Sequence, residues 1–124
     1  MNFNQSILII AITVMSACSN NETKNNEASD VSTVISGEQL FKINCAQCHR
    51  PAEDLIGPAL KDVRSRWKNK ELLYAFIHNP QDVIVKDPYA KELFNKWKQA
   101  YMQPFPNLSK EEINRIFDYC DNAK

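Results

Sequence analysis

Apolar residues recur at helical spacing in four segments of the chain, and no segment reads convincingly as a strand. Side chains three and four positions apart share one face of a helix, so each segment has one side that can be buried. The four sets are Leu40, Phe41 and Ile43; Leu72, Leu73, Phe76 and Ile77; Tyr89, Leu93 and Trp97; and Ile113, Ile116, Phe117 and Cys120. This pattern predicts an all-α fold.

Capping residues mark the expected starts of these helices. A serine followed three residues later by Gln or Glu forms a capping box, and Asn or Asp is also a favoured N-cap. A helix usually ends before a proline, as expected at Pro80, because the residue that precedes proline avoids helical geometry. The predicted N-caps are Ser36 (with Gln39), Asn69, Asp87 (before Pro88) and Ser109 (with Glu112).

The first 35 residues are expected to precede the folded domain. Residues 7–14 form an apolar run that is too short for a membrane span of about 20 residues, so they predict the core of a signal peptide. Residues 15–18, Met-Ser-Ala-Cys, resemble the lipobox of bacterial lipoproteins, in which the cysteine becomes the acylated first residue. Residues 1–6 lack the Lys or Arg that is usual in such leaders. The alternative is an ordinary secretory signal with an incidental Cys18.

Residues 20–34 are rich in Asn, Glu, Ser and Thr and contain no aromatic residue. Such a composition cannot bury enough apolar surface to offset its ordering entropy, which predicts a flexible tether. The expected organisation is a signal peptide (1–17), a tether (18–35) and one domain (36–124). The lipoprotein interpretation places that domain at the bacterial cell envelope, on the periplasmic or outer face of a membrane, held by a lipid on Cys18.

The sequence CAQCH at residues 45–49 is the attachment signature of a c-type haem. Two nearby thiols, Cys45 and Cys48, can add to the two vinyl groups of haem as thioethers. His49 follows at once and can offer a ring nitrogen to the iron. With this motif the chain resembles the class I cytochromes c. The resemblance implies a small fold of about four to five helices wrapped around one covalent haem, with the first and last helices crossing.

Further residues carry this resemblance. Class I cytochromes commonly have Gly-Pro-x-Leu after the haem motif, as at residues 57–60, which implies that the Pro58 carbonyl accepts a hydrogen bond from His49 and that Leu60 packs on the haem. Gly37 would let the first helix cross the last one closely. A propionate contact of Trp67 or Trp97 stays a secondary expectation, because aromatic residues at this spacing are usually core.

Met102 is the candidate sixth ligand. It is the only methionine after residue 17, and it lies in a proline-stiffened loop just before the last helix, where class I cytochromes place that ligand. The alternative is that Met102 is a buried methionine that fills a gap in the core. Cys120 is expected to be a small core residue, and His78 an exposed residue at a helix end.

Two other interpretations of the Cys-x-x-Cys compete with haem. A thioredoxin-like redox motif needs a βαβ setting, and a zinc site would have to combine Cys45, Cys48, Cys120 and His78. Neither explains the positions of Gly57-Pro58 and Met102. The resemblance implies an electron carrier for redox protein partners, not an enzyme, because two axial ligands leave no site for a small-molecule substrate. A permanent cytochrome subunit of a respiratory complex or reductase is the alternative.

The charges of the chain bear on its partners. The 15 basic and 15 acidic residues balance, which argues against nucleic acid as a partner. Residues 61–70 nevertheless hold five Lys or Arg and one Asp. Around an exposed haem edge, together with Lys42 and Arg50, these cations would steer an acidic partner. The alternative is that they are solvated side chains without a docking role.

Overall fold

The computed structural model describes residues 34–97 and 100–124, so the predicted signal peptide, nearly all of the predicted tether and Cys18 lie outside it. Within these residues there are helices and no strand, which confirms the all-α prediction. The helices are α1 (Gly37–Asn44), α2 (Val63–Arg66), α3 (Lys70–His78), α4 (Pro80–Ile84), α5 (Pro88–Lys96) and α6 (Lys110–Asn122). None of the helices described is long and apolar enough to cross a membrane.

The predicted N-caps are present. Ser36 and Ser109 each form a complete capping box, with Gln39 and Glu112 respectively. The side chains of Asn69 and Asp87 accept hydrogen bonds from backbone amides in the first turns of α3 and α5. Each cap satisfies amide groups that have no partner inside the helix, so local sequence alone sets where the four longer helices begin.

The described residues form six helices: the four expected longer ones and two short ones, α2 and α4, that the sequence did not indicate. They contain four and five residues, too few to show an apolar period in the sequence. Pro80 ends α3 and also opens α4 as its first residue, where the missing N–H of proline costs nothing. The proline that was expected only to end one helix therefore also starts a second one.

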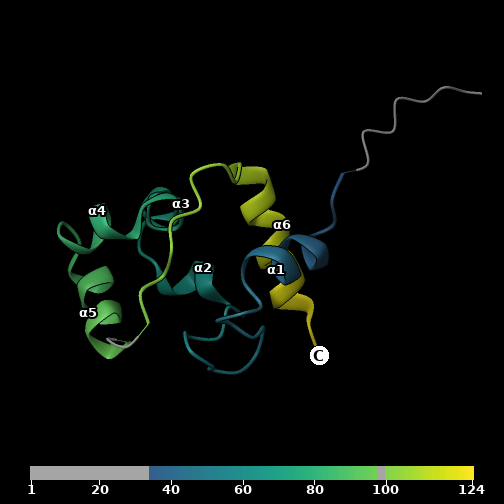
Figure 1. Ribbon diagram of the computed structural model, residues 1–124, viewed down its shortest axis with the longest axis horizontal. Helices are drawn as coiled ribbons and strands as arrows, with labels where there is room; N and C mark the ends of the chain where they lie inside the picture. Colours follow the sequence, from purple (N-terminus) through teal and green to yellow (C-terminus); the bar gives the residue numbers. More distant parts are fainter. Residues whose placement is uncertain (1–33, 98–99) are drawn as a thin grey trace, which may run out of the picture. The chain divides into compact units, whose positions relative to one another are not determined.

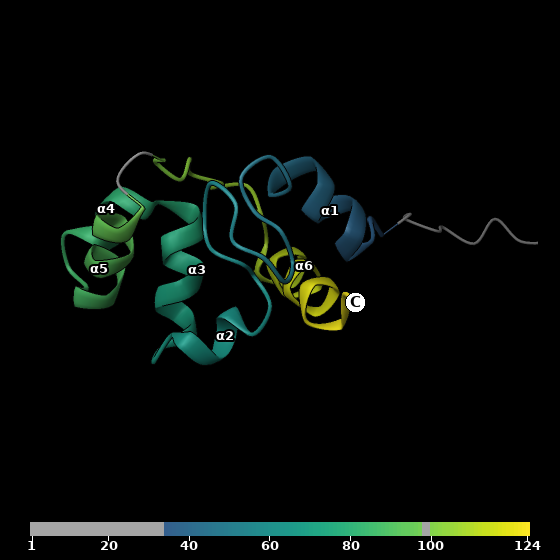
Figure 2. The same ribbon diagram turned by 90° about the horizontal axis from the view of Figure 1, so that it is seen from below.

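Helices α1 and α6 pack against each other, as expected of the first and last helices (Figures 1 and 2). A Cβ atom at Gly37 would lie 2.0 Å from the backbone oxygen of Arg115, so a side chain there would force the helices apart. The rings of Phe41 and Tyr119 pack across the same crossing, 5.4 Å between centroids. Cys120 is fully buried in α6, and burial raises the pKa of its thiol to about 12, so it is a core residue.

A polar contact joins the segment around α2 to the end of α6. The Asp121 carboxylate accepts a hydrogen bond from the Asp62 amide at 2.7 Å and from the Arg64 guanidinium at 2.5 Å. Arg64 also pairs with Asp118 at 2.8 Å. Asp62 has a φ of 56°, an uncommon left-handed conformation for a residue other than glycine. Part of the basic run at residues 61–70 is thus paired with acidic residues of α6.

Candidate functional site

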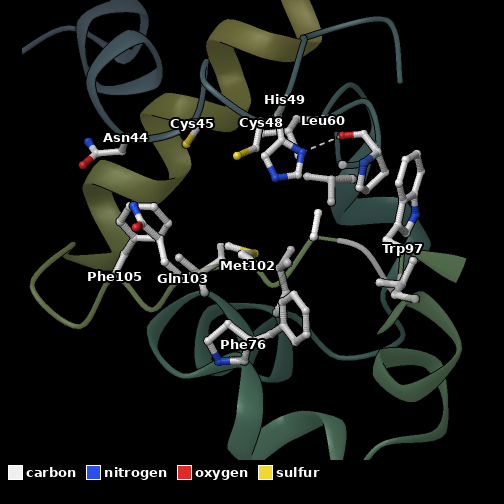
Figure 3. Close-up of a pocket in the computed structure, with 18 of the residues that line it drawn as sticks. Asn44, Cys45, Cys48, His49, Leu60, Phe76, Trp97, Met102, Gln103 and Phe105 are labelled. Carbon is white, nitrogen blue, oxygen red and sulfur yellow. Dashed lines mark hydrogen bonds between the residues drawn. The ribbon is translucent and has the colours of Figure 1, made fainter. Parts of the chain in front are cut away.

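A cavity of about 290 Å³ lies among the loop that follows α1, helix α3, segment 100–108 and helix α6 (Figure 3). Apolar side chains from α3 and α6 form much of its wall, so it is suited to a large apolar group. The predicted site residues on this wall are Cys45, Cys48, His49, Pro58, Leu60 and Met102. The fold therefore brings together every residue that the sequence placed at the haem.

His49 is held by the backbone around it. Its Nδ1 atom lies 2.7 Å from the Pro58 carbonyl oxygen, and because a carbonyl only accepts, Nδ1 carries the proton and donates. Burial lowers the pKa of His49, while the bond to Pro58 opposes that shift. The neutral ring then keeps a free electron pair on Nε2, the atom that can bind a metal.

Gly57 makes this position of the ring sterically feasible. A Cβ atom at residue 57 would lie 2.5 Å from Cε1 of His49, inside the contact distance of two carbon atoms. The Gly57 amide donates to the Cys48 carbonyl at 2.9 Å, which closes the loop and brings Gly57 against the ring. Glycine is required here for close approach, and a turn conformation with positive φ is not involved.

Cys45 and Cys48 both border the cavity. Cys45 is half-buried and Cys48 is exposed. Burial raises the pKa of Cys45 to about 11, with a smaller contribution from the neighbouring Cys48, so its thiol is protonated at neutral pH. Two thiols on one loop, beside a histidine that faces the same cavity, match the chemistry of attachment to two vinyl groups.

Met102 reaches the cavity from the other side. In Figure 3, Cys45, Cys48 and His49 border the cavity on one side, and Met102 faces them from a separate segment, beside Gln103 and above Phe76. The methionine is half-buried and packs against the apolar core. A thioether and an imidazole thus face the same space from two parts of the chain.

The two tryptophans differ in their surroundings. Trp67 is buried in an aromatic cluster, with its ring centroid 5.1 Å from those of Phe76 and Tyr89. Trp97 also borders the cavity, and its Nε1 atom is buried without a hydrogen-bond partner in the part of the chain that the structure describes. A buried N–H without an acceptor is costly, so Trp97 is the tryptophan suited to donate to a polar group bound in the cavity.

His78 lies outside this cavity wall and is not the exposed residue that was expected. It is half-buried, and its Nε2 atom lies 2.7 Å from the Leu108 carbonyl oxygen. The zinc alternative also lacks support, because the described ranges 34–97 and 100–124 contain no group of three or more His, Cys, Asp or Glu placed to hold a metal ion. The remaining interpretation of the motif is haem attachment.

A family model for cytochrome c matches residues 34–124. The chain belongs to the cytochrome c family. It is therefore an electron-transfer haem protein whose cofactor is covalently bound haem c. The match covers all six helices and every cavity residue named above, so the family assignment applies to the whole described domain.

Solved structures agree with this assignment. A cytochrome c from Rhodothermus marinus shares 36% sequence identity over 68% of this chain and 70% of its own, with a TM-score of 0.55. An engineered form of that protein shares 31% identity over 77% of this chain and 82% of its own, also at 0.55. The cytochrome c domain of a Pseudomonas putida protein shares 30% identity over 69% of this chain and 85% of its own, at 0.52. No curated protein sequence matches the chain significantly.

The residues of this cytochrome fit a haem. The wall supplies apolar side chains, two thiols, a neutral imidazole with Nδ1 already engaged, a thioether, and an indole N–H without an acceptor among the described residues. Sequence reasoning treated the apolar stripe of α3 as core only, whereas Leu73, Phe76 and Ile77 also border the cavity. A helical apolar period cannot separate these two roles, because protein core and cofactor bury the same face.

Proposed function

We propose that this cytochrome is a membrane-tethered, monohaem carrier of single electrons between respiratory redox partners. Cys45 and Cys48 would hold the haem as thioethers, with His49 and Met102 as the two axial ligands of its iron. The observation that carries the proposal is the placement of His49 and Met102 at one cavity from opposite sides, with both thiols on the loop of His49 (Figure 3). When bound, haem supplies the one-electron couple of ferric and ferrous iron.

The chain would tune that couple through one backbone carbonyl and several side chains. The Pro58 carbonyl fixes the His49 ring and makes its Nε2 atom a stronger donor. The soft thioether of Met102 favours the ferrous state and raises the reduction potential relative to two histidines. The apolar wall would exclude water, and Trp97, whose N–H has no acceptor among the described residues, would donate to a propionate.

The proposal excludes enzyme activity for the intact protein. With both axial positions filled by side chains, peroxide could reach the iron only after Met102 dissociates. Voltammetry of the purified protein should therefore show one reversible one-electron wave that is indifferent to peroxide. Met102→Ala should lower the potential and introduce a catalytic peroxide current. A catalytic current from the unmodified protein would favour a peroxidase instead.

Tethering rests on residues 7–18, whose pattern resembles a lipoprotein leader. The mature protein should partition into membranes or detergent, because two or three acyl chains, at about 0.8 kcal/mol per buried CH₂, anchor stably where one does not. Cys18→Ala should release or mislocalise the protein. An unmodified mature terminus elsewhere, found by mass spectrometry, would refute the anchor but leave the electron-carrier proposal intact.

A permanent place in a respiratory complex or reductase remains the alternative to a tethered shuttle. The two differ in what stays bound to the cytochrome when membranes are solubilised gently. A shuttle should be isolated alone from the detergent extract, whereas a subunit should co-purify with fixed stoichiometric partners.

A further inference from the structure

The segment that carries Met102 is fastened to the C-terminal end of α3. The last carbonyls of a helix have no partner inside the helix, and the Ile77 carbonyl accepts a hydrogen bond from the Phe105 amide at 3.0 Å. One residue later, His78 Nε2 lies 2.7 Å from the Leu108 carbonyl oxygen. Since that oxygen only accepts, Nε2 carries a proton and donates it.

These two bonds hold both ends of one turn. Phe105 and Leu108 are themselves joined by a backbone hydrogen bond of 3.3 Å, and both side chains pack against the core. Met102 stands three residues before this turn. Within the described residues, His78 provides the one side-chain hydrogen bond that segment 100–108 receives. The loop of the proposed ligand therefore depends on His78 for its single side-chain attachment.

We propose that His78 is a positioning residue for Met102, acting through the Leu108 carbonyl to keep the methionine turned towards the cavity. The inference rests on the proposed function, in which Met102 is the sixth ligand of the iron. His78 does not border the cavity, so it acts on the iron through the loop and not by contact. Its role is to limit how easily the loop swings away and frees the sixth position.

The affinity for an added ligand measures how easily the sixth position is freed, because that ligand can bind the ferric iron only after Met102 leaves. We would titrate the oxidised holoprotein with imidazole and follow the Soret absorption. His78→Asn and His78→Gln form a matched pair, since both carry an amide and differ by one methylene. The glutamine amide nitrogen reaches about as far as Nε2 of histidine and can donate to Leu108, whereas the asparagine amide falls short.

His78→Asn should raise the apparent imidazole affinity about two- to tenfold, the factor that one net hydrogen bond contributes, and His78→Gln should stay close to the unmodified protein. Tyr74→Phe is the control, because it removes a different tie of α3, the bond from Tyr74 to Asn114 of α6 at 2.9 Å. It should lower the unfolding midpoint without changing the imidazole affinity.

The outcomes separate this inference from the function on which it rests. Equal imidazole affinities for His78→Asn and His78→Gln, with the methionine–iron band still present and still abolished by Met102→Ala, would overturn the role of His78 alone. An increase in affinity for Tyr74→Phe as large as that for His78→Asn would show a general loss of stability, and would also overturn it. Absence of the methionine–iron band from the unmodified protein would refute the proposed ligation itself.

Discussion

The two sides of the haem cavity are built differently. On the side of His49, the single loop between α1 and α2 carries both thiols, the histidine, the glycine that makes room for its ring and the carbonyl that orients it. On the opposite side, Met102 lies on a segment that is attached to α3 through Ile77 and His78. One side is specified by residues near each other in sequence, and the other depends on a helix more than twenty residues away.

This difference indicates that one side of the cavity attaches the haem and the other side controls its sixth ligand. The loop of His49 is closed by its own backbone hydrogen bonds, and covalent attachment would add to them. It is suited to hold the cofactor permanently. The segment of Met102 is held by a few non-covalent contacts, so its attachment sets how firmly the sixth ligand stays in place. Changes on the first side should therefore remove or misplace the haem, and changes on the second should alter only its ligation.

The largest effect should come from removing the covalent attachment. In the double variant Cys45→Ala, Cys48→Ala, haem no longer has thiols to join, so haem-dependent peroxidase staining should vanish from a denaturing gel. The unmodified protein and Cys120→Ala should both keep it, because Cys120 is buried in α6 and belongs to the core. Loss of staining when the unmodified protein is denatured would contradict the covalent attachment.

A smaller effect is expected from Gly57→Ala. The added methyl group would lie 2.5 Å from the His49 ring and 2.9 Å from its Nδ1 atom, so the ring or the loop must shift. Overpacking of this kind costs about 1–3 kcal/mol. Here it should also weaken the bond to Pro58, which makes His49 a weaker donor to ferric iron and so raises the reduction potential. Gly37→Ala is the comparison, because it crowds the crossing of α1 and α6 instead. Gly37→Ala should lower the free energy of unfolding with little change in the haem absorption spectrum.

The smallest effect should come from Asp121, which lies away from both ligands. Burial alone would raise its pKa, but hydrogen bonds from Arg64 and the Asp62 amide outweigh burial and hold the pKa below its ordinary value. A carboxyl group with a lowered folded-state pKa stabilises the protein above its unfolded pKa and loses that contribution as pH falls through the folded value. The contribution should therefore be complete at neutral pH and decline progressively as pH falls below about 4.

Urea unfolding of Asp121→Asn checks this. The variant should be about 1 kcal/mol less stable at pH 7, and its difference from the unmodified protein should shrink as pH falls below 4. Asp118→Asn is the matched control, because this carboxylate is more exposed and, among the described residues, pairs only with Arg64. Its effect should be smaller. A constant difference for Asp121→Asn at all pH values would contradict the predicted linkage.

The sequence predicted the fold most accurately where structure is local. The N-caps of α1, α3, α5 and α6 depend on side chains within three residues of the helix start, and all four were correct. The haem motif could likewise be recognised from residues 45–49 alone. Helices α2 and α4 were not predicted, because a helix of about one turn is too short to show a repeating pattern of apolar residues.

Contacts between distant segments could not be predicted. The bond from His78 to Leu108 spans thirty residues, and nothing in either residue indicates the other. Arg64 similarly appeared to be part of a basic docking run, whereas it pairs with two carboxylates of α6. The sequence alone does not show whether a charged side chain is paired in the fold. Because Arg64 is paired, it is less available to attract an acidic redox partner than the composition of residues 61–70 suggested.

The central claim is that His49 and Met102 are the two axial ligands, and the far-red absorption of the oxidised protein tests it most directly. Ferric haem bound by methionine sulfur absorbs weakly in that region. The unmodified protein should show the band and Met102→Ala should lose it. His78→Ala should keep it, because His78 lies outside the cavity wall and loss of its bond to Leu108 should weaken methionine ligation only about two- to tenfold. A band that survives Met102→Ala, or normal low-spin ligation that is lost in His78→Ala, would contradict the account.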